Sequence, residues 1–255
     1  MSWIAYWNAE PTVYVSDRHR QVHYETVARD IVGVLPGQTA RVVDYGCGDA
    51  LSASLVADRC AHLYLCDGAE AVRARLAERY AGRLNVGIIS PQQFEQLPDG
   101  GVDLIVVNSV VQYLSMLELQ RLLTIARRQL RPDGALLLAD IVPPGVGPLT
   151  DAAALLRFAG AHGLLLSACA GLVRSFFSSY RRTRREYGLL RFDEGQIIDL
   201  LERSGFRAQR HYPNLGHNQK RMALLARPHS EQPQAQPIGT LPPQPGAASG
   251  STTAA

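Results

Sequence analysis

Short apolar runs alternate along this chain with segments in which apolar residues recur at helical spacing. Such runs are typical of buried strands, and leucines three or four positions apart are typical of one helix face. The runs that predict strands are residues 42–45, 62–66, 84–89, 102–107, 135–141, 205–212 and 220–227. Helices are predicted at 69–80 and 117–130. This alternation predicts an α/β fold, in which right-handed crossovers place helices on both faces of a parallel sheet.

The first predicted strand ends in a turn with glycines at alternate positions, Gly46 and Gly48. Because glycine lacks a Cβ, the backbone here can bend sharply and approach a ligand closely. We expect the next helix to begin near Leu51 with Asp49 as its cap, so that its N-terminal amides point into the same crevice. The pattern indicates a site for a nucleotide-type ligand.

Two kinds of ligand compete for this glycine turn. A dinucleotide fingerprint needs a third glycine at position 51, which is Leu51, and Asp49 would place a carboxylate beside a pyrophosphate. The better fit is an acidic residue followed by small residues at alternate positions: Asp44, Gly46, Gly48 and Ala50. This pattern resembles motif I of the class I S-adenosylmethionine-dependent methyltransferases, whose cofactor carries an amino group and a sulfonium. Ala50 departs from the third glycine that the family often has.

Later segments continue the resemblance in the family's order. Asp67 ends the second strand about 20 positions after Gly46, as a ribose ligand should, although its role could be limited to capping the next helix. Residues 108–113 are similar to the segment after strand four in small-molecule methyltransferases, and residues 130–135 look like the LRPGG turn before strand five. The resemblance implies a Rossmann-like doubly wound sheet of about seven strands, mostly parallel with an antiparallel edge strand.

The resemblance implies S-adenosylmethionine as the cofactor and assigns residues to its binding. Asp44 suits the cationic methionine end, Asp67 the ribose hydroxyls, and the polar turn after strand three the adenine edge. The expected cofactor-binding residues are Tyr14, Asp44, Gly46, Cys47, Gly48, Asp67, Gly68, Ser90, Pro91, Gln92, Asn108 and Ser109.

Methyl transfer from a sulfonium is an in-line displacement, so catalysis is expected to depend mainly on alignment. Tyr113 and Gln112 are the first candidates to face the acceptor, and His23 or His217 is a candidate base for a hydroxyl acceptor. Asn108 is not followed by the Pro-Pro-Tyr typical of amino-group methylation of DNA or glutamine. We therefore expect a small-molecule acceptor, lipophilic in one interpretation, with oxygen mildly favoured.

Two other functions are considered. An aminopropyltransferase shares the fold, but the sequence has no identifiable acidic polyamine-binding run. A non-catalytic binding module would keep the fold, yet it would not need a ribose carboxylate such as Asp67.

The chain divides into five predicted parts. They are an N-terminal lid and helix at 1–40, a cofactor-binding core at 41–141, a helical cap insertion at 142–192, the C-terminal part of the sheet at 193–227, and a disordered tail at 228–255. Lid candidates are Tyr14, His19, His23 and Tyr24. The alternative is a helix packed on the sheet with surface histidines.

The insertion combines an uncharged run at 158–173 with an arginine-rich stretch at 174–185. The run is shorter than the roughly 20 residues that cross a bilayer. We expect a cap over the active site. A second hypothesis is peripheral contact of 158–185 with the inner membrane face.

Composition narrows the expected partners and location. A net charge of +3, without interleaved basic and aromatic residues, does not indicate nucleic acid. The cysteines show neither C-x-x-C spacing nor a cluster of histidines beside them, so no metal site is expected. Reduced thiols and the absence of a visible signal peptide favour a cytoplasmic location. The oligomeric state is not predicted.

Overall fold

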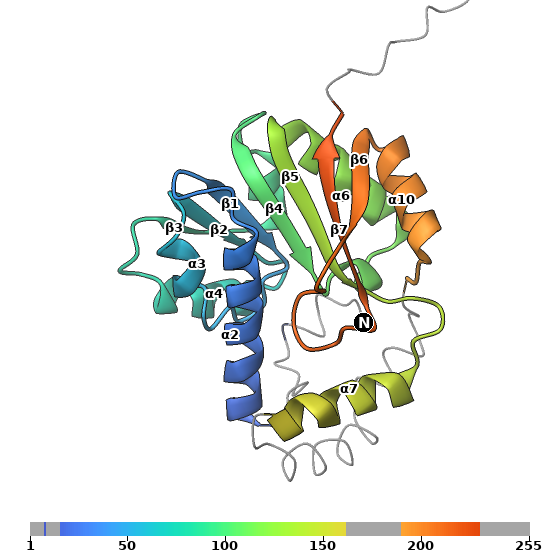
Figure 1. Ribbon diagram of the computed structural model, residues 1–255. Coiled ribbons are helices and arrows are strands. Elements are labelled where there is room, and N and C mark those ends of the chain that lie inside the picture. The colour runs from blue at the N-terminus through green and yellow to red at the C-terminus, as the bar shows by residue number, and fades with distance from the viewer. Residues whose placement is uncertain (1–7, 9–15, 162–189, 230–255) are drawn as a thin grey trace, which may run out of the picture.

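The computed structural model describes residue 8 and residues 16–161 and 190–229 (Figure 1). Seven strands form one sheet in the order β3-β2-β1-β4-β5-β7-β6. They are β1 (Arg41–Tyr45), β2 (His62–Cys66), β3 (Val86–Ile89), β4 (Val102–Asn108), β5 (Leu130–Ile141), β6 (Phe206–His211) and β7 (Met222–Pro228). Strands β1 to β5 are parallel, and β7 is antiparallel to both β5 and β6. The predicted α/β class and mostly parallel seven-stranded sheet are confirmed.

Helices connect the strands and cover the sheet. They are α2 (Asp17–Gly33), α3 (Ser54–Ala57), α4 (Glu70–Arg79), α5 (Pro91–Glu95), the 3₁₀ helix η1 (Val111–Tyr113), α6 (Met116–Gln129), α7 (Pro148–Ala161) and α10 (Glu194–Arg203). The helices predicted at 69–80 and 117–130 are present as α4 and α6. Local periodicity was sufficient to place both.

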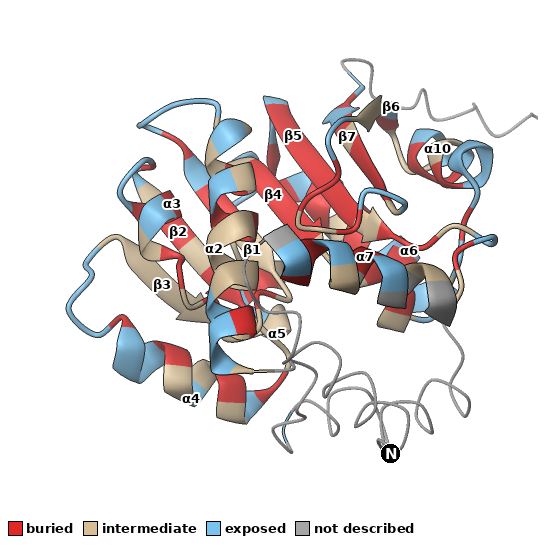
Figure 2. Cartoon of the chain, turned by 60° about the horizontal axis from the view of Figure 1, so that its bottom comes forward, coloured by how far each residue is buried: buried red, intermediate tan, exposed pale blue. Residues whose placement is uncertain are grey.

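Two hydrophobic cores lie on the two faces of the sheet. In β1, Val42 packs in the core formed with α2, α3 and α4, whereas Val43 packs in the core formed with α5, α6 and α10. In β4, Val106 packs in the first of these cores and Val107 packs in the second. Consecutive residues are therefore buried in the middle of the central strands, as at 104–107 in β4 and 135–139 in β5 (Figure 2), as expected for strands covered on both faces.

The helix predicted to begin near Leu51 with Asp49 as its cap is wrong. Helix α3 begins at Ser54, and its N-cap residue, Ala53, has no side-chain cap. The carboxylate of Asp49 instead accepts hydrogen bonds from Arg75 of α4. Because that carboxylate is occupied by an arginine from another helix, it does not cap its own segment.

The turn predicted at residues 130–135 is accommodated inside β5, which begins at Leu130. Leu130 pairs with Val102, but Ala135 pairs with Leu104, so the ladder register jumps between these two pairs. The residues between them bulge out before the strand continues to the site.

Helix α7 belongs to the predicted insertion at 142–192. Residues 162–189 lie outside the described part of the chain, as do most of the segment 158–185 and nearly all of the predicted tail. Among the described residues, no helix combines the length and apolar character needed to cross a membrane.

Candidate active site

A cavity of about 1070 Å³ opens at the carboxyl ends of β1, β2, β4 and β5. This end of the sheet faces α7, and α2 lies beside it (Figure 1). Ligands of open α/β sheets bind at this edge. The volume slightly exceeds the roughly 300–1,000 Å³ of typical small-molecule sites. It therefore has room for a cofactor and a second small molecule.

The glycine turn forms one wall of the cavity and has no space for side chains. Gly46 and Gly48 have φ angles of 75° and 57°. A Cβ on Gly46 would lie 2.2 Å from Cγ2 of Val110, and one on Gly48 would lie 2.7 Å from Oη of Tyr24. Ala50, at the position of the family's third glycine, also has a positive φ, of 39°. We call this turn the glycine cradle, because residues larger than glycine would fill the space that it leaves at the cavity wall.

Asp44 lines the cavity at the end of β1. Burial, and secondly the nearby carboxylate of Asp67, raise the pKa of Asp44 to about 7. An acid in this environment gains from a cationic partner, since the partner would offset both the burial and the repulsion. The ammonium of an amino acid moiety provides such a partner.

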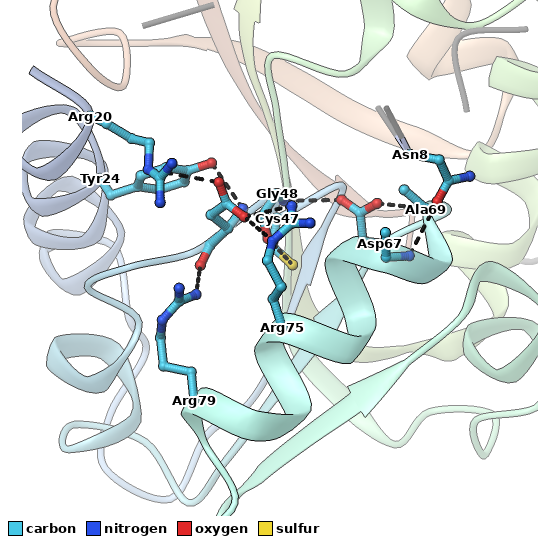
Figure 3. Close-up of polar contacts among 11 residues, drawn as sticks. Asn8, Arg20, Tyr24, Cys47, Gly48, Asp67, Ala69, Arg75 and Arg79 are labelled. Atoms are coloured by element: carbon cyan, nitrogen blue, oxygen red, sulfur yellow. Dashed lines mark hydrogen bonds and ion pairs between the residues drawn. The ribbon is translucent and has the colours of Figure 1, made fainter. Parts of the chain in front are cut away.

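Asp67, at the end of β2, is fixed by backbone amides (Figure 3). Its Oδ2 accepts from the Gly48 N–H at 3.0 Å, and its Oδ1 accepts from the Ala69 N–H at 2.8 Å. Burial raises the pKa of the Asp67 carboxyl, against these two bonds and the charge of Arg73. Each carboxylate oxygen has a second lone pair for a hydroxyl. The bond to Ala69 reaches the N-cap residue of α4, which has no side-chain cap, so Asp67 is not limited to capping that helix.

The other expected cofactor residues divide into three groups. Cys47, Gly68, Pro91 and Gln92 line the cavity. Ser90 is not among the described lining residues: its Oγ accepts from the Gln93 N–H, and it forms the N-cap of α5 in a capping box. Tyr14 lies outside the described residues.

Asn108 ends β4 at the cavity wall. Its buried Oδ1 has no hydrogen-bond partner among the described residues. A buried acceptor without a partner is costly, so a donor on a bound ligand would stabilise it. The glycine cradle, Asp44, Asp67 and this acceptor together fit S-adenosylmethionine, which offers an ammonium, ribose hydroxyls and no phosphate.

A polar network, which we call the Asp140 network, lies at the ends of β4 and β5. Oδ2 of Asp140 accepts from Nη1 of Arg221 at 2.6 Å and from Oγ of Ser109 at 2.7 Å. Arg221 also donates to Oε1 of Gln112 at 3.3 Å. All four residues line the cavity, and Ser109 and Asp140 both have φ angles of 60°. Gln112 is thus held by the side chain of Arg221, which is distant in the sequence.

Two members of the Asp140 network, Asp140 and Arg221, were not predicted from the sequence. The position of Asp140 near the end of the fifth predicted strand was a usable signal, because acids at strand ends had already been singled out at Asp44 and Asp67. Arg221 has no local signal, since it reaches the site from the position just before β7.

Three histidines line the cavity from α2 and the loop before β7: His19, His23 and His217. The ring of Phe158 on α7 lies against His19 and His217, and we call these four residues the imidazole cluster. The ring of His217 lies 6.4 Å from that of His19, 6.1 Å from that of His23 and 4.9 Å from that of Phe158, measured between centroids. Desolvation, and then the charge of His217, lower the pKa of His19 to about 4 and that of His23 to about 3. Both rings are neutral at pH 7.

The predicted catalytic residues belong to the imidazole cluster or share its cavity, and the low pKa values of its histidines decide which of them can act as a base. Tyr113, Gln112, His23 and His217 all line the same cavity. A pKa near 3 makes His23 a weak base, so its imidazole is better suited to hydrogen bonding than to proton removal. Within the described part of the chain, no group of His, Cys, Asp and Glu has the arrangement of a metal site.

Comparisons with known proteins agree with this geometry. Residues 43–138 match the family model of a methyltransferase domain. No curated protein sequence matches the chain. The fold is similar to that of the methyltransferase solved with the Haloferax volcanii Trm112 activator, at 12% identity and a TM-score of 0.59, over 90% of this chain and 99% of that one. It is also similar to the mitomycin 7-O-methyltransferase MmcR, at 20% identity and a TM-score of 0.58, over 89% of this chain and 61% of that one.

A further structure, phosphoethanolamine N-methyltransferase 1 of Haemonchus contortus, matches at 24% identity and a TM-score of 0.48, over 57% of this chain. The match spans 32% of that longer protein. The match of the family model identifies residues 43–138 as a methyltransferase domain. Its cofactor is S-adenosylmethionine, as predicted from the sequence.

Proposed function

We propose that this protein transfers the methyl group of S-adenosylmethionine to a small, uncharged and largely apolar molecule, with a hydroxyl as the favoured acceptor. The observation that carries the proposal is that one cavity joins the cofactor cradle to the Asp140 network and the imidazole cluster. A second molecule in this cavity can therefore approach the cofactor directly. Apolar side chains of Leu114, Leu122, Ile125 and Leu190 complete the lining.

The charges that line the cavity disfavour an anionic acceptor. The two arginines of the described lining are both paired: Arg121 with Glu95 at 2.8 Å and Arg221 with Asp140 at 2.6 Å. Asp44 and Asp67 add negative charge on the cofactor side. A carboxylate entering this cavity would be desolvated without a free cation to compensate it. A neutral acceptor does not meet this cost.

The roles of individual residues follow from this arrangement. The bound cofactor supplies an electrophilic methyl group. Asp44 and Asn108 hold the methionine end, Asp67 holds the ribose, and Pro91 and Gln92 contact the adenine. The acceptor lies against Gln112, Tyr113 and the imidazole cluster, where Gln112 and neutral imidazoles orient its hydroxyl. Alignment is the main contribution of the protein.

The test uses acceptors that share one ring system and differ in one group. The purified protein is incubated with S-adenosylmethionine labelled in the methyl group and with 2-naphthol, 2-naphthoate or 2-naphthylamine. Label is expected in the extracted methyl ether of 2-naphthol. The Asp67→Ala variant should lose this label, because the ribose carboxylate is removed. Transfer to the carboxylate or the amine in preference to the hydroxyl would contradict the proposed acceptor class.

The remaining expectations stay predictions. Peripheral membrane contact through 158–185 rests mostly on residues outside the described ranges, and co-sedimentation with anionic vesicles tests it. A cytoplasmic location is consistent with the free thiols of Cys47, Cys60 and Cys66 among the described residues. A non-catalytic or differently reacting binding protein of the same fold would bind the cofactor and label none of the acceptors.

A further inference from the structure

Asp49 follows Gly48 in the cofactor loop, and its carboxylate is largely buried. Its side chain is 15% exposed. Oδ1 accepts from Nε and Nη2 of Arg75 on α4, at 3.1 and 2.9 Å. Oδ2 lies 3.8 Å from Nε of Arg20 on α2. One carboxylate thus joins two helices that are distant in sequence.

The backbone of Asp49 is held by the same two helices. Its N–H donates to Oη of Tyr24 on α2 at 2.9 Å, and its carbonyl accepts from Nη1 of Arg79 at the end of α4 at 2.6 Å. Arg20 and Tyr24 lie on one side of the loop, opposite Arg75 and Arg79 (Figure 3). We call these contacts the Asp49 clamp.

The clamp acts on a loop that already positions the ribose carboxylate. The N–H of Gly48, one residue before Asp49, donates to Oδ2 of Asp67 at 3.0 Å. A shift of the loop would change this bond and turn the carboxylate of Asp67. The contact between Gly48 and the Tyr24 hydroxyl is so close that a Cβ would lie 2.7 Å from it. The position of α2 against the loop and the position of Asp67 are therefore linked through Gly48.

Helix α2 presents a different face to the acceptor side of the cavity. Residues 20 and 24 are one turn apart and face the cofactor loop, whereas residues 19 and 23 are one turn apart on a neighbouring face. His19 and His23 contact the ring of His217 there. A helix held at positions 20 and 24 is held at 19 and 23 as well.

We propose that Asp49 is a positioning residue that couples cofactor binding to the position of α2 against the cofactor loop. It does not line the cavity. It holds the loop so that Gly48 orients Asp67, and it holds α2 so that the imidazole cluster is assembled beside the cofactor. The effect on cofactor binding rests on the S-adenosylmethionine site, and the effect on the acceptor side rests on the proposed function.

The test measures S-adenosylhomocysteine binding and hydrogen exchange in three variants. Asp49→Asn keeps the shape and removes the charge, and Arg75→Gln removes the partner on α4. The matched control is Asp58→Asn, because Asp58 pairs with Arg83 of the following segment but both side chains are exposed, at 54% and 40%. Exposed ion pairs of this kind contribute about 0–1 kcal/mol.

Calorimetry should show affinity for S-adenosylhomocysteine about tenfold weaker in Asp49→Asn and Arg75→Gln, the usual effect of losing a charged hydrogen bond. Asp58→Asn should bind as the wild type does. In the wild type, the ligand should slow amide exchange in α2, at residues 19–28. In both clamp variants this protection should disappear while α6 keeps its exchange rates, a pattern that general destabilisation does not produce.

Wild-type affinity in both clamp variants, with the protection of α2 retained, would overturn the proposal. If Asp49→Asn fails to fold, Tyr24→Phe removes the hydroxyl that accepts from the Asp49 N–H, and the same loss of protection is expected. Failure of the acceptor class would leave these results unchanged, because no acceptor is present. A wild-type protein that does not bind S-adenosylhomocysteine would contradict the cofactor site itself.

Discussion

Among single residues, Asp44 has the electrostatic setting that bears most directly on cofactor binding. Its pKa, raised to about 7 by burial and by Asp67, means that much of the carboxyl is protonated below pH 7. An ammonium binds the ionised form, so affinity should rise with pH up to about 7 and then level off. The expected change is up to about tenfold per pH unit below 7.

Calorimetry with S-adenosylhomocysteine at pH 5.5, 6.5 and 7.5 measures this dependence. Asp44→Asn removes the titrating group and should bind weakly at all three pH values. The imidazoles of His19 and His23, with pKa values near 4 and 3, stay neutral over this range and do not contribute. An equal slope in Asp44→Asn and in the wild type would assign the pH dependence to another group.

At the scale of elements, the imidazole cluster joins α2, α7 and the loop before β7. An exposed histidine in the unfolded chain has a pKa near 6.5, whereas burial lowers the pKa values of His19 and His23 to about 4 and 3. Below pH 6.5 the unfolded chain therefore binds protons that the folded chain does not. The free energy of unfolding should fall as the pH drops from 6.5 to 4, by up to about 1.4 kcal/mol per pH unit for each ring.

Urea unfolding at pH 7.5, 6 and 5 tests this expectation. His23→Gln should lose less stability on acidification than the wild type, because one of the two imidazoles with a lowered pKa is gone. His229→Gln is the matched control, since His229 is exposed. A wild-type acid response in His23→Gln would show that this ring is not buried in its neutral form.

The elements also show how far the sequence could predict this structure. The central strands, α4 and α6 follow from local periodicity, because both faces of the sheet are covered and each helix has one apolar face. The glycine turn was recognisable because its constraint is local. The start of α3 was not, since Arg75 of α4 occupies the carboxylate that would have capped an earlier helix.

Long-range pairs explain the part of the site that the sequence did not predict. Asp140 and Arg221 are 81 positions apart and meet because β7 inserts beside β5. His217 meets α2 through the loop before β7, which is fastened by a hydrogen bond from the Gly216 N–H to Asp30 at 2.7 Å. No local sequence pattern predicts such contacts, although His217, His19 and His23 were each candidates in the sequence analysis.

At the scale of the whole molecule, the cavity is built from segments throughout the described chain. Helix α2, the ends of β1, β2, β4 and β5, and residues 217 and 221 all contribute to it. A ligand that contacts these segments at once binds the folded chain and not the unfolded one. Cofactor binding should therefore stabilise the entire fold, and the size of this effect depends on ligand concentration and affinity alone.

Thermal unfolding with S-adenosylhomocysteine or NAD separates the two ligands that the glycine turn first allowed. S-adenosylhomocysteine at 100 times its Kd should add about 2.7 kcal/mol, which corresponds to a rise in Tm of about 5–10 °C for a domain of this size. NAD should give no rise, because both arginines of the described cavity lining are paired with carboxylates, and Asp44 and Asp67 would repel its pyrophosphate. Asp67→Ala should reduce the rise with S-adenosylhomocysteine at the same ligand concentration. A rise with NAD as large as that with S-adenosylhomocysteine would mean that the loop after β1 does not discriminate against a pyrophosphate.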